Sequence, residues 1–260
     1  MCRHLAYLGP PLPLSRLLFD PPHALAHQSW APRDMRGGGT INADGFGIGW
    51  FPDGGGRDGP ADGAAPVRYR RARPLWADAE LPGLAAVTRS GAVLAAVRSA
   101  TAGMPVTECA AAPFTDGRWL FSHNGVVAGW PDSMLALAGR LPVRDLLTLA
   151  APTDSALLWA LVLARLREGA GAADAIAATV VDVAAAAPAS RLNLLLVDAH
   201  TAVATAFDHA LSVRATGDAV LLSSEPLDAD PAWRSVPEAH LVVATATTVR
   251  LSPLPLKEKP

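Results

Sequence analysis

The 260-residue chain lacks the features of several large classes of protein. No apolar stretch continues for the roughly 18 residues of a membrane-spanning helix without a charged residue or a proline. The first residues have no cationic segment followed by a long apolar run, so they do not resemble a secretory signal. The 22 basic and 24 acidic residues are dispersed, so no basic stripe indicates a nucleic-acid partner. We therefore expect a cytoplasmic protein that binds neither membranes nor nucleic acids.

Cysteine is also scarce, because the chain has only Cys2 and Cys109. Two cysteines make no disulfide framework, and there is no paired CxxC motif for zinc. The seven histidines show neither HxxH nor HExxH spacing, so we expect no metal and no other cofactor. We expect both thiols to be reduced and Cys109 to be packed as a small apolar side chain.

Apolar residues, in contrast, make up half of the chain, which is enough for a large core. Strands are expected at residues 2–8, 46–51, 67–73, 93–98, 119–123, 191–198, 202–207, 211–215, 219–223, 240–244 and 247–251. Helices are expected at residues 131–140, 143–150, 154–167 and 172–187, the third capped by Thr153 or Asp154. This order predicts an α+β fold with two mainly antiparallel sheets, each covered by helices on one face. We expect a single domain over residues 2–260.

Glycine is concentrated in two places. The segment Gly45-Phe46-Gly47-Ile48-Gly49 is spaced like part of a dinucleotide loop, but a turn follows it instead of a helix, which excludes that interpretation. Glycines on one face of a strand let a substrate or another backbone approach closely. The glycine-rich residues 53–66 predict a long hairpin loop, with a lid over a site as the alternative.

The position of Cys2 carries the first functional hypothesis. Removal of Met1 would leave a thiol and a free α-amine on one residue. An α-amine with an ordinary pKa of about 8 can accept the thiol proton near neutral pH, so Cys2 could act as both nucleophile and base. The alternative is a small apolar residue at the start of a strand.

Three other segments each allow a catalytic and a structural interpretation. Arg98 ends a strand and could hold a carboxylate, or it could form a surface ion pair. Asn124 and Gly125 could supply the N–H groups of an oxyanion hole, or they could form a hairpin turn. Asp154 could bind a substrate ammonium, or it could cap the helix that it begins.

Together with Cys2, these segments resemble the motifs of the class II glutamine amidotransferases, which are N-terminal-nucleophile hydrolases. The matching motifs are Cys2, Arg98-Ser99-Ala100-Thr101, His123-Asn124-Gly125 and Asp154. The resemblance implies a four-layer αββα sandwich. It implies Cys2 as the nucleophile and Asn124 and Gly125 as oxyanion donors. Arg98, Ser99, Thr101, His123 and Asp154 would then contact the γ-glutamyl group.

Nearly the whole chain is also similar to the γ-glutamyl hydrolases of ergothioneine biosynthesis. The similar segments are Met1–Leu5, Gln28–Arg33, Asn42–Gly45, Val97–Thr101, Ser224–Asp228 and Asp230–Trp233. The similarity implies that a Cys2 thioester forms while γ-glutamyl-hercynylcysteine sulfoxide is cleaved to glutamate and hercynylcysteine sulfoxide. Ser99 and Ala102 replace the Trp and His that are common in the wider amidotransferase family, which alters the pocket beside the glutamyl group.

Two other functions compete with this hydrolase. One is a stand-alone glutaminase subunit that delivers ammonia to a partner, and the other is a non-catalytic γ-glutamyl-binding module. The residues of the leaving-group pocket are not evident in the sequence. Trp30, Trp50 and Trp76 are candidates for contact with a trimethylammonium group, with core packing as the alternative for each.

Overall fold

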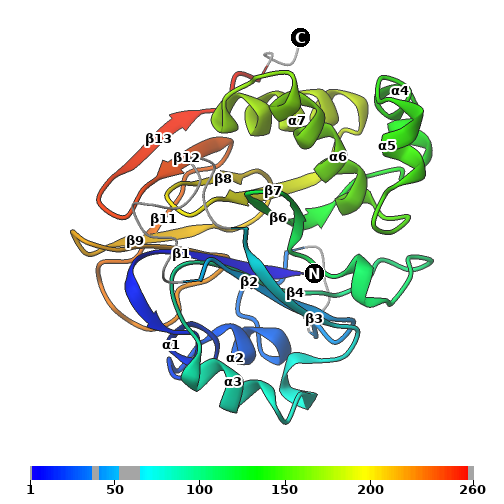
Figure 1. Cartoon of the computed structure of the whole chain (residues 1–260). Coiled ribbons are helices and arrows are strands. Elements are labelled where there is room, and N and C mark those ends of the chain that lie inside the picture. The colour runs from blue at the N-terminus through cyan, green and yellow to red at the C-terminus, as the bar shows by residue number, and fades with distance from the viewer. Residues whose placement is uncertain (1, 37–40, 53–64, 257–260) are drawn as a thin grey trace.

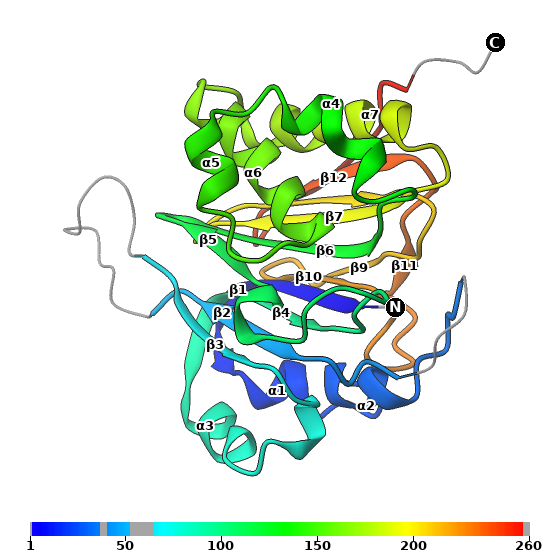
Figure 2. The same cartoon turned by 90° about the vertical axis from the view of Figure 1, so that its right-hand side faces the viewer.

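The computed structural model describes residues 2–36, 41–52 and 65–256. Two sheets pack face to face, and helices cover the outer face of each sheet (Figures 1 and 2). The strand pairings that define the two sheets are antiparallel. This four-layer αββα arrangement confirms the predicted fold class.

The first sheet has the strand order β11-β9-β10-β1-β4-β2-β3, so β1 lies at its centre. Its strands are β1 (Arg3–Pro13), β2 (Phe46–Trp50), β3 (Val67–Arg71), β4 (Arg89–Val97), β9 (Ser212–Ala215), β10 (Val220–Ser223) and β11 (Arg234–Ser235). The helices on its outer face are α1 (Ser15–Leu18), α2 (Leu25–Trp30) and α3 (Leu81–Val87).

The second sheet has the order β13-β12-β8-β7-β6-β5. Its strands are β5 (Phe114–Asp116), β6 (Trp119–Val126), β7 (Arg191–Val197), β8 (Ala202–Ala206), β12 (His240–Ala244) and β13 (Val249–Pro253). The helices of its outer layer are α4 (Leu135–Ala138), α5 (Val143–Leu147), α6 (Asp154–Arg167) and α7 (Ala172–Ala186). Within the described ranges, none of the helices has the length and apolar character needed to cross a membrane.

Side-chain alternation along the strands divides the core into three layers. On β1, Leu5 and Tyr7 pack toward the helices, whereas Ala6 and Leu8 pack between the two sheets. On β6, Phe121 belongs to the cluster with α6 and α7 and is stacked on Trp159, whereas its neighbour Leu120 lies between the sheets. The period of two thus determines which residues of each strand reach the space between the sheets.

Two glycines of β2 allow the sheets to approach each other. A Cβ on Gly47 would lie 2.2 Å from the carbonyl oxygen of Ala112, and one on Gly49 would lie 2.6 Å from Leu120. No real Cβ makes such a contact. The close backbone approach expected from the glycine spacing is therefore confirmed.

Several short elements were not predicted from the sequence, including α1, α2, α3, β5 and β11. α1 and α2 have only four and six residues, which is too few to show a helical period. Helix α6, in contrast, has the predicted limits, and Thr153 caps it by accepting a hydrogen bond from the N–H of Ala156. Strands β2 and β3 pair as predicted, although most of the connecting loop, residues 53–64, lies outside the described residues.

The packing at β2 yields a stability prediction. Gly47→Ala should lower the free energy of unfolding by about 1–3 kcal/mol, because the new methyl group meets a backbone carbonyl that is held in place. Gly83→Ala is the matched control. It lies in α3 with no atom near the added Cβ, and it should be neutral or stabilising by about 0.5–1 kcal/mol. Urea denaturation of both variants tests this, and equal effects would contradict it.

Candidate active site

The nucleophile candidate Cys2 lies directly before the central strand β1. It is partly exposed, and its thiol is 3.8 Å from the carbonyl oxygen of Ser99. Pairing of Arg3 with Val97 brings the start of β1 beside the end of β4, where the Arg98 segment begins. Two of the motifs found in the sequence are therefore adjacent in space. Met1 lies outside the described residues.

The alternation along β1 also brings Cys2 toward the second sheet. Ala6 lies between the sheets, and so does His4, whose Nδ1 is 2.9 Å from the hydroxyl of Ser122 on β6. Cys2 is two residues before His4, so it lies on the same face of the strand. Asn124 is two residues after Ser122, and it therefore shares that face of β6.

The hydroxyl of Ser224 links Asn124 to the start of β1. It accepts hydrogen bonds from the His4 N–H and from Asn124 Nδ2, both at 3.0 Å, and it donates to the His4 carbonyl at 3.2 Å. The nitrogen of the Asn124 amide faces this hydroxyl. One N–H of that amide is bound to Ser224, and the other can serve as a donor to a substrate oxygen.

The hairpin-turn alternative for Asn124 and Gly125 is wrong. Both residues lie inside β6, where they pair with Asn193 and Leu192 of β7. Gly125 is required there for a different reason, since a Cβ would lie 1.8 Å from the Arg191 carbonyl oxygen. The turn preference of the Asn-Gly pair is therefore overridden by tertiary packing.

Arg98 is buried, and this excludes the surface ion pair considered from the sequence. Its guanidinium donates to the Pro105 carbonyl at 2.7 Å, which closes the loop that follows β4. The backbone of Arg98 bonds to Gly45 and Asp44, and the Asp44 carboxylate accepts the Ala100 N–H at 2.8 Å. These contacts hold the Arg98–Pro105 loop beside Cys2.

Asp154 occupies the first turn of α6, but Thr153 is the capping residue. The buried Asp154 carboxylate accepts the N–H of Val127 at 3.1 Å, which brings the start of α6 to the end of β6. His123 lies on the opposite face of β6 from Asn124. Its ring nitrogens are 3.0 Å from the Ser155 hydroxyl and 2.9 Å from the Arg191 carbonyl.

Sequence reasoning missed the buried ion pair behind Cys2. Arg3 Nε donates to Glu225 at 2.8 Å, and the same guanidinium donates to the Cys2 carbonyl at 2.9 Å and to the Asp34 carbonyl. Both side chains of the pair are almost fully buried. The adjacency of Arg3 to Cys2 was visible in the sequence, but its partner is 222 residues away.

Glu225 also joins two of the segments that are similar to the ergothioneine hydrolases, namely Gln28–Arg33 and its own segment, Ser224–Asp228. Its carboxylate accepts hydrogen bonds from the N–H groups of Arg33 and Asp34 and lies 2.6 Å from His23 Nε2. Burial alone would raise the pKa of Glu225, but the bonds from His23 and Arg33 and the charge of Arg3 lower it to about 2. The carboxylate is therefore ionised. It anchors the backbone of Arg33 and Asp34 to the end of β10.

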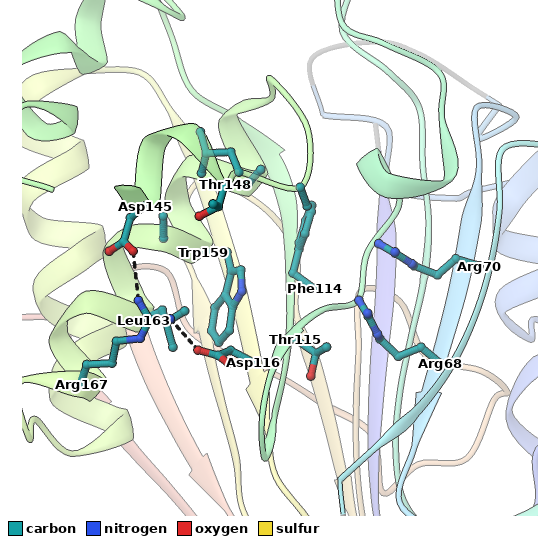
Figure 3. A pocket seen from close by; sticks show the side chains of 14 residues that line it. Arg68, Arg70, Phe114, Thr115, Asp116, Asp145, Thr148, Trp159, Leu163 and Arg167 are labelled. Atoms are coloured by element: carbon teal, nitrogen blue, oxygen red, sulfur yellow. Dashed lines mark hydrogen bonds and ion pairs between the residues drawn. The ribbon is translucent and has the colours of Figure 1, made fainter. Parts of the chain in front are cut away.

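A separate cleft of about 250 Å³ lies between α5, α6 and the edge strands β3 and β5 (Figure 3). Arg167 pairs with Asp116 and Asp145 on one side of it, while Arg68 and Arg70 lie on the other. Cys2, Arg98, Asn124, Gly125 and Asp154 are not among its lining residues. The candidate active site is therefore at the start of β1, away from this cleft.

Two expectations about packing are corrected. Cys109 is exposed because it lies in a short surface 3-10 turn, so it is not a packed apolar residue. Trp30 and Trp76 are 51% and 45% exposed, so neither is a core residue, whereas Trp50 on β2 is partly buried. Trp30 lies edge-on against His27. In the part of the chain that the structure describes, no three His, Cys, Asp or Glu side chains are grouped as metal ligands.

Similarity to known proteins shows the family to which the chain belongs. Residues 18–216 match the family model of the class II glutamine amidotransferases. The chain belongs to this family. Glutamine phosphoribosylpyrophosphate amidotransferase from Bacillus subtilis has the same fold, with a TM-score of 0.65 at 12% identity over 98% of this chain and 50% of that one. This class II amidotransferase domain thus shares its αββα architecture with that solved amidotransferase.

Two curated relatives of the class II amidotransferase chain are much more similar in sequence. They are the γ-glutamyl-hercynylcysteine sulfoxide hydrolases of Mycobacterium tuberculosis (strain CDC 1551 / Oshkosh) and Mycolicibacterium smegmatis. They are 42% and 43% identical to it over 254 residues. The match covers 98% of this chain and 97% and 100% of those relatives. The resemblance inferred from the sequence motifs is confirmed.

Buried titratable groups near the site should make stability depend on pH. Burial is the largest cause that lowers the pKa of His4 from 6.5 to about 3, with a smaller contribution from the charge of Arg3. Burial, together with the charge of Arg3, lowers the pKa of His209 to about 4. Both rings are neutral in the folded protein and would gain a proton on unfolding at acidic pH. Their contribution to stability is complete above pH 6.5 and is lost as the pH falls toward the folded-state values.

We therefore expect the free energy of unfolding to fall below about pH 6.5, with a slope approaching about 2.7 kcal/mol per pH unit from the two histidines. The depressed pKa of Glu225 adds a further loss below its ordinary value of 4.5. Urea denaturation at several pH values measures the slope. His209→Leu should reduce it by about half, whereas the exposed His200→Ala should not change it. A flat profile down to pH 5 would contradict the burial of neutral histidines.

Proposed function

We propose that this protein hydrolyses the γ-glutamyl amide bond of γ-glutamyl-hercynylcysteine sulfoxide, releasing glutamate and hercynylcysteine sulfoxide. The observation that carries this proposal is the 42–43% identity to two hydrolases of that name over nearly the full length of both chains. Cys2 lies beside the Arg98 segment, and Ser224 links Asn124 to His4, two residues after Cys2; this supports an active enzyme more than a binding module.

In the proposed mechanism, Cys2 is both the nucleophile and the base. We propose that residues 2–260 form the single domain that carries out the reaction. The free α-amine takes the thiol proton, and the thiolate attacks the γ-carbonyl carbon. The tetrahedral intermediate collapses, the C–N bond breaks, and the leaving amine takes the proton from the α-ammonium group. Water then attacks the γ-glutamyl thioester, which releases glutamate and restores the thiol. The steps need no cofactor. The proposed substrate is a small molecule, and we place the protein in the cytoplasm.

We assign the oxyanion to the Asn124 amide and the Gly125 backbone N–H. Supporting this role, Ser224 holds the Asn124 amide with its nitrogen bound toward the start of β1. A donor that is fixed before the substrate arrives needs no reorganisation when negative charge develops on the oxygen.

We assign the glutamyl head group to the charged residues on either side of this point. Arg98 would bind its carboxylate together with Ser99 and Thr101, and Asp154 would bind its ammonium group. We also assign His123 to the glutamyl-binding residues, because Ser155 connects it to Asp154. The Ser155 hydroxyl is 3.2 Å from the Asp154 carboxylate and 3.0 Å from His123 Nδ1.

The assay that tests the proposed function compares two substrates. The purified protein should release glutamate from γ-glutamyl-hercynylcysteine sulfoxide with a higher kcat/KM than from glutamine. The reverse preference would favour the stand-alone glutaminase. Release from neither substrate by a sample with a free Cys2 amine would favour the binding module.

The free amine of Cys2 provides a second prediction. Protein that retains Met1 or carries an N-terminal tag should be inactive, because the Cys2 nitrogen is then an amide without basicity. Cleaving a removable tag directly before Cys2 should restore turnover. Intact-mass analysis gives the N-terminus of each sample, and full activity with a blocked Cys2 nitrogen would exclude the proposed mechanism.

Removal of the oxyanion donor provides a third prediction. Asn124→Ala should lower the rate of acylation by about 10²–10³. Asn124→Asp has almost the same shape but loses the N–H donor, so it should be impaired as well. Denaturation curves measured beside the kinetics separate catalysis from folding. A loss of stability with normal turnover per folded molecule would mean that Asn124 is structural.

A further inference from the structure

The strand order around Cys2 separates the site into two halves. On one side of β1 lies β4, which ends in the Arg98–Pro105 loop where we place the glutamyl group. On the other side lies β10, which is followed by Ser224 and Glu225, with β9 and then β11 beyond it. The N-terminus and β11 lie at the same edge of the molecule (Figure 2). A substrate bound by its glutamyl half on the β4 side would extend its amine half toward β10.

A cavity of about 640 Å³ opens on this β10 side. Its wall includes Ser224 and Glu225, Ser212 at the start of β9, and Ser235 on β11. Cys2, Asn124 and Gly125 do not line this cavity, but Ser224 does, and its hydroxyl binds the Asn124 amide, so Ser224 connects the cavity to the proposed oxyanion site. The volume lies within the range of small-molecule sites.

One side chain of this cavity is an unpaired hydrogen-bond donor. His209 is 1% exposed, and its Nδ1 accepts the Ala210 N–H at 2.7 Å. The proton of the neutral ring is therefore on Nε2, which has no hydrogen-bond partner among the described residues. Its lowered pKa keeps the ring neutral at pH 7. An unpaired buried N–H is costly, and a ligand oxygen that accepts it would remove this cost.

The charges around the cavity fit a zwitterion. Arg33 and Arg36 line it together with Asp34 and Glu238. Hercynylcysteine sulfoxide carries carboxylates and a trimethylammonium group. We propose that this cavity is the subsite for the amine half of the substrate and that His209 Nε2 donates a hydrogen bond to one of its carboxylates. This assignment rests on the function proposed above.

The test compares kcat/KM for γ-glutamyl-hercynylcysteine sulfoxide with kcat/KM for γ-glutamylmethylamide, whose amine half is too small to fill the cavity. His209→Leu removes the donor and should lower the ratio of the two values by at least about tenfold. His209→Gln keeps an N–H at a similar distance from the backbone and should recover part of the ratio.

A steric variant tests the cavity without disturbing a buried residue. Ser235 is exposed on the edge strand β11, so Ser235→Trp should fold normally, fill the cavity and lower the same ratio. Ser252→Trp is the matched control, because Ser252 is exposed on the edge strand β13 of the other sheet. It should leave both values unchanged.

Alkylation of Cys2 by a diazoketone analogue of glutamine, which has no amine half, reports on the nucleophile and the glutamyl site alone. Its rate should be the same in wild type, His209→Gln and Ser235→Trp. A wild-type ratio in both His209→Leu and Ser235→Trp would overturn this inference while leaving the proposed function intact. An equal loss on both amides with slower alkylation would also overturn it. Wild-type protein that is alkylated but hydrolyses neither amide would instead overturn the proposed function.

Discussion

The site depends on the anchoring of the first residues of β1. A chain terminus usually frays, and a nucleophile at a frayed end could not be aligned with oxyanion donors from another sheet. Here the Arg3–Glu225 ion pair holds the Cys2 carbonyl from the helix side of the strand. The hydroxyl of Ser224 holds the His4 backbone from the side between the sheets. Consecutive residues of one segment therefore anchor both faces of β1, and Ser224 orients Asn124 by the same hydroxyl.

This anchoring brings together residues that are more than 200 positions apart in the sequence. The glutamyl half of the proposed site comes from β4 and the start of α6, whereas the proposed amine half comes from the segment before residue 37 and from β9, β10 and β11. Buried carboxylates commonly destabilise a protein unless they are paired and hydrogen-bonded, and Glu225 satisfies both conditions. Its four hydrogen-bonding partners, on Arg3, His23, Arg33 and Asp34, connect the N-terminal part of the chain to the residues that follow β10.

Much of this arrangement was predictable from the sequence. Cys2 and the Arg98 segment are adjacent as expected, and α6 begins at Asp154, because strong strand and helix patterns surround these residues. The placement of Asn124 and Gly125 inside a strand was not predictable, since their local preference is for a turn and the constraint is the backbone of Arg191. Arg3 and Glu225 were missed as partners because nothing in local sequence reports a contact over 222 residues.

In the mechanism that we propose, Cys2 forms a covalent γ-glutamyl thioester. Rapid acid quenching of the protein during turnover of γ-glutamyl-hercynylcysteine sulfoxide, followed by peptide mass analysis, tests it most directly. We predict a mass increase of one glutamyl residue on the Cys2 peptide, which builds up and decays with turnover and is absent in Cys2→Ala. Glutamate release by Cys2→Ala, or an adduct on a peptide without Cys2, would contradict the account.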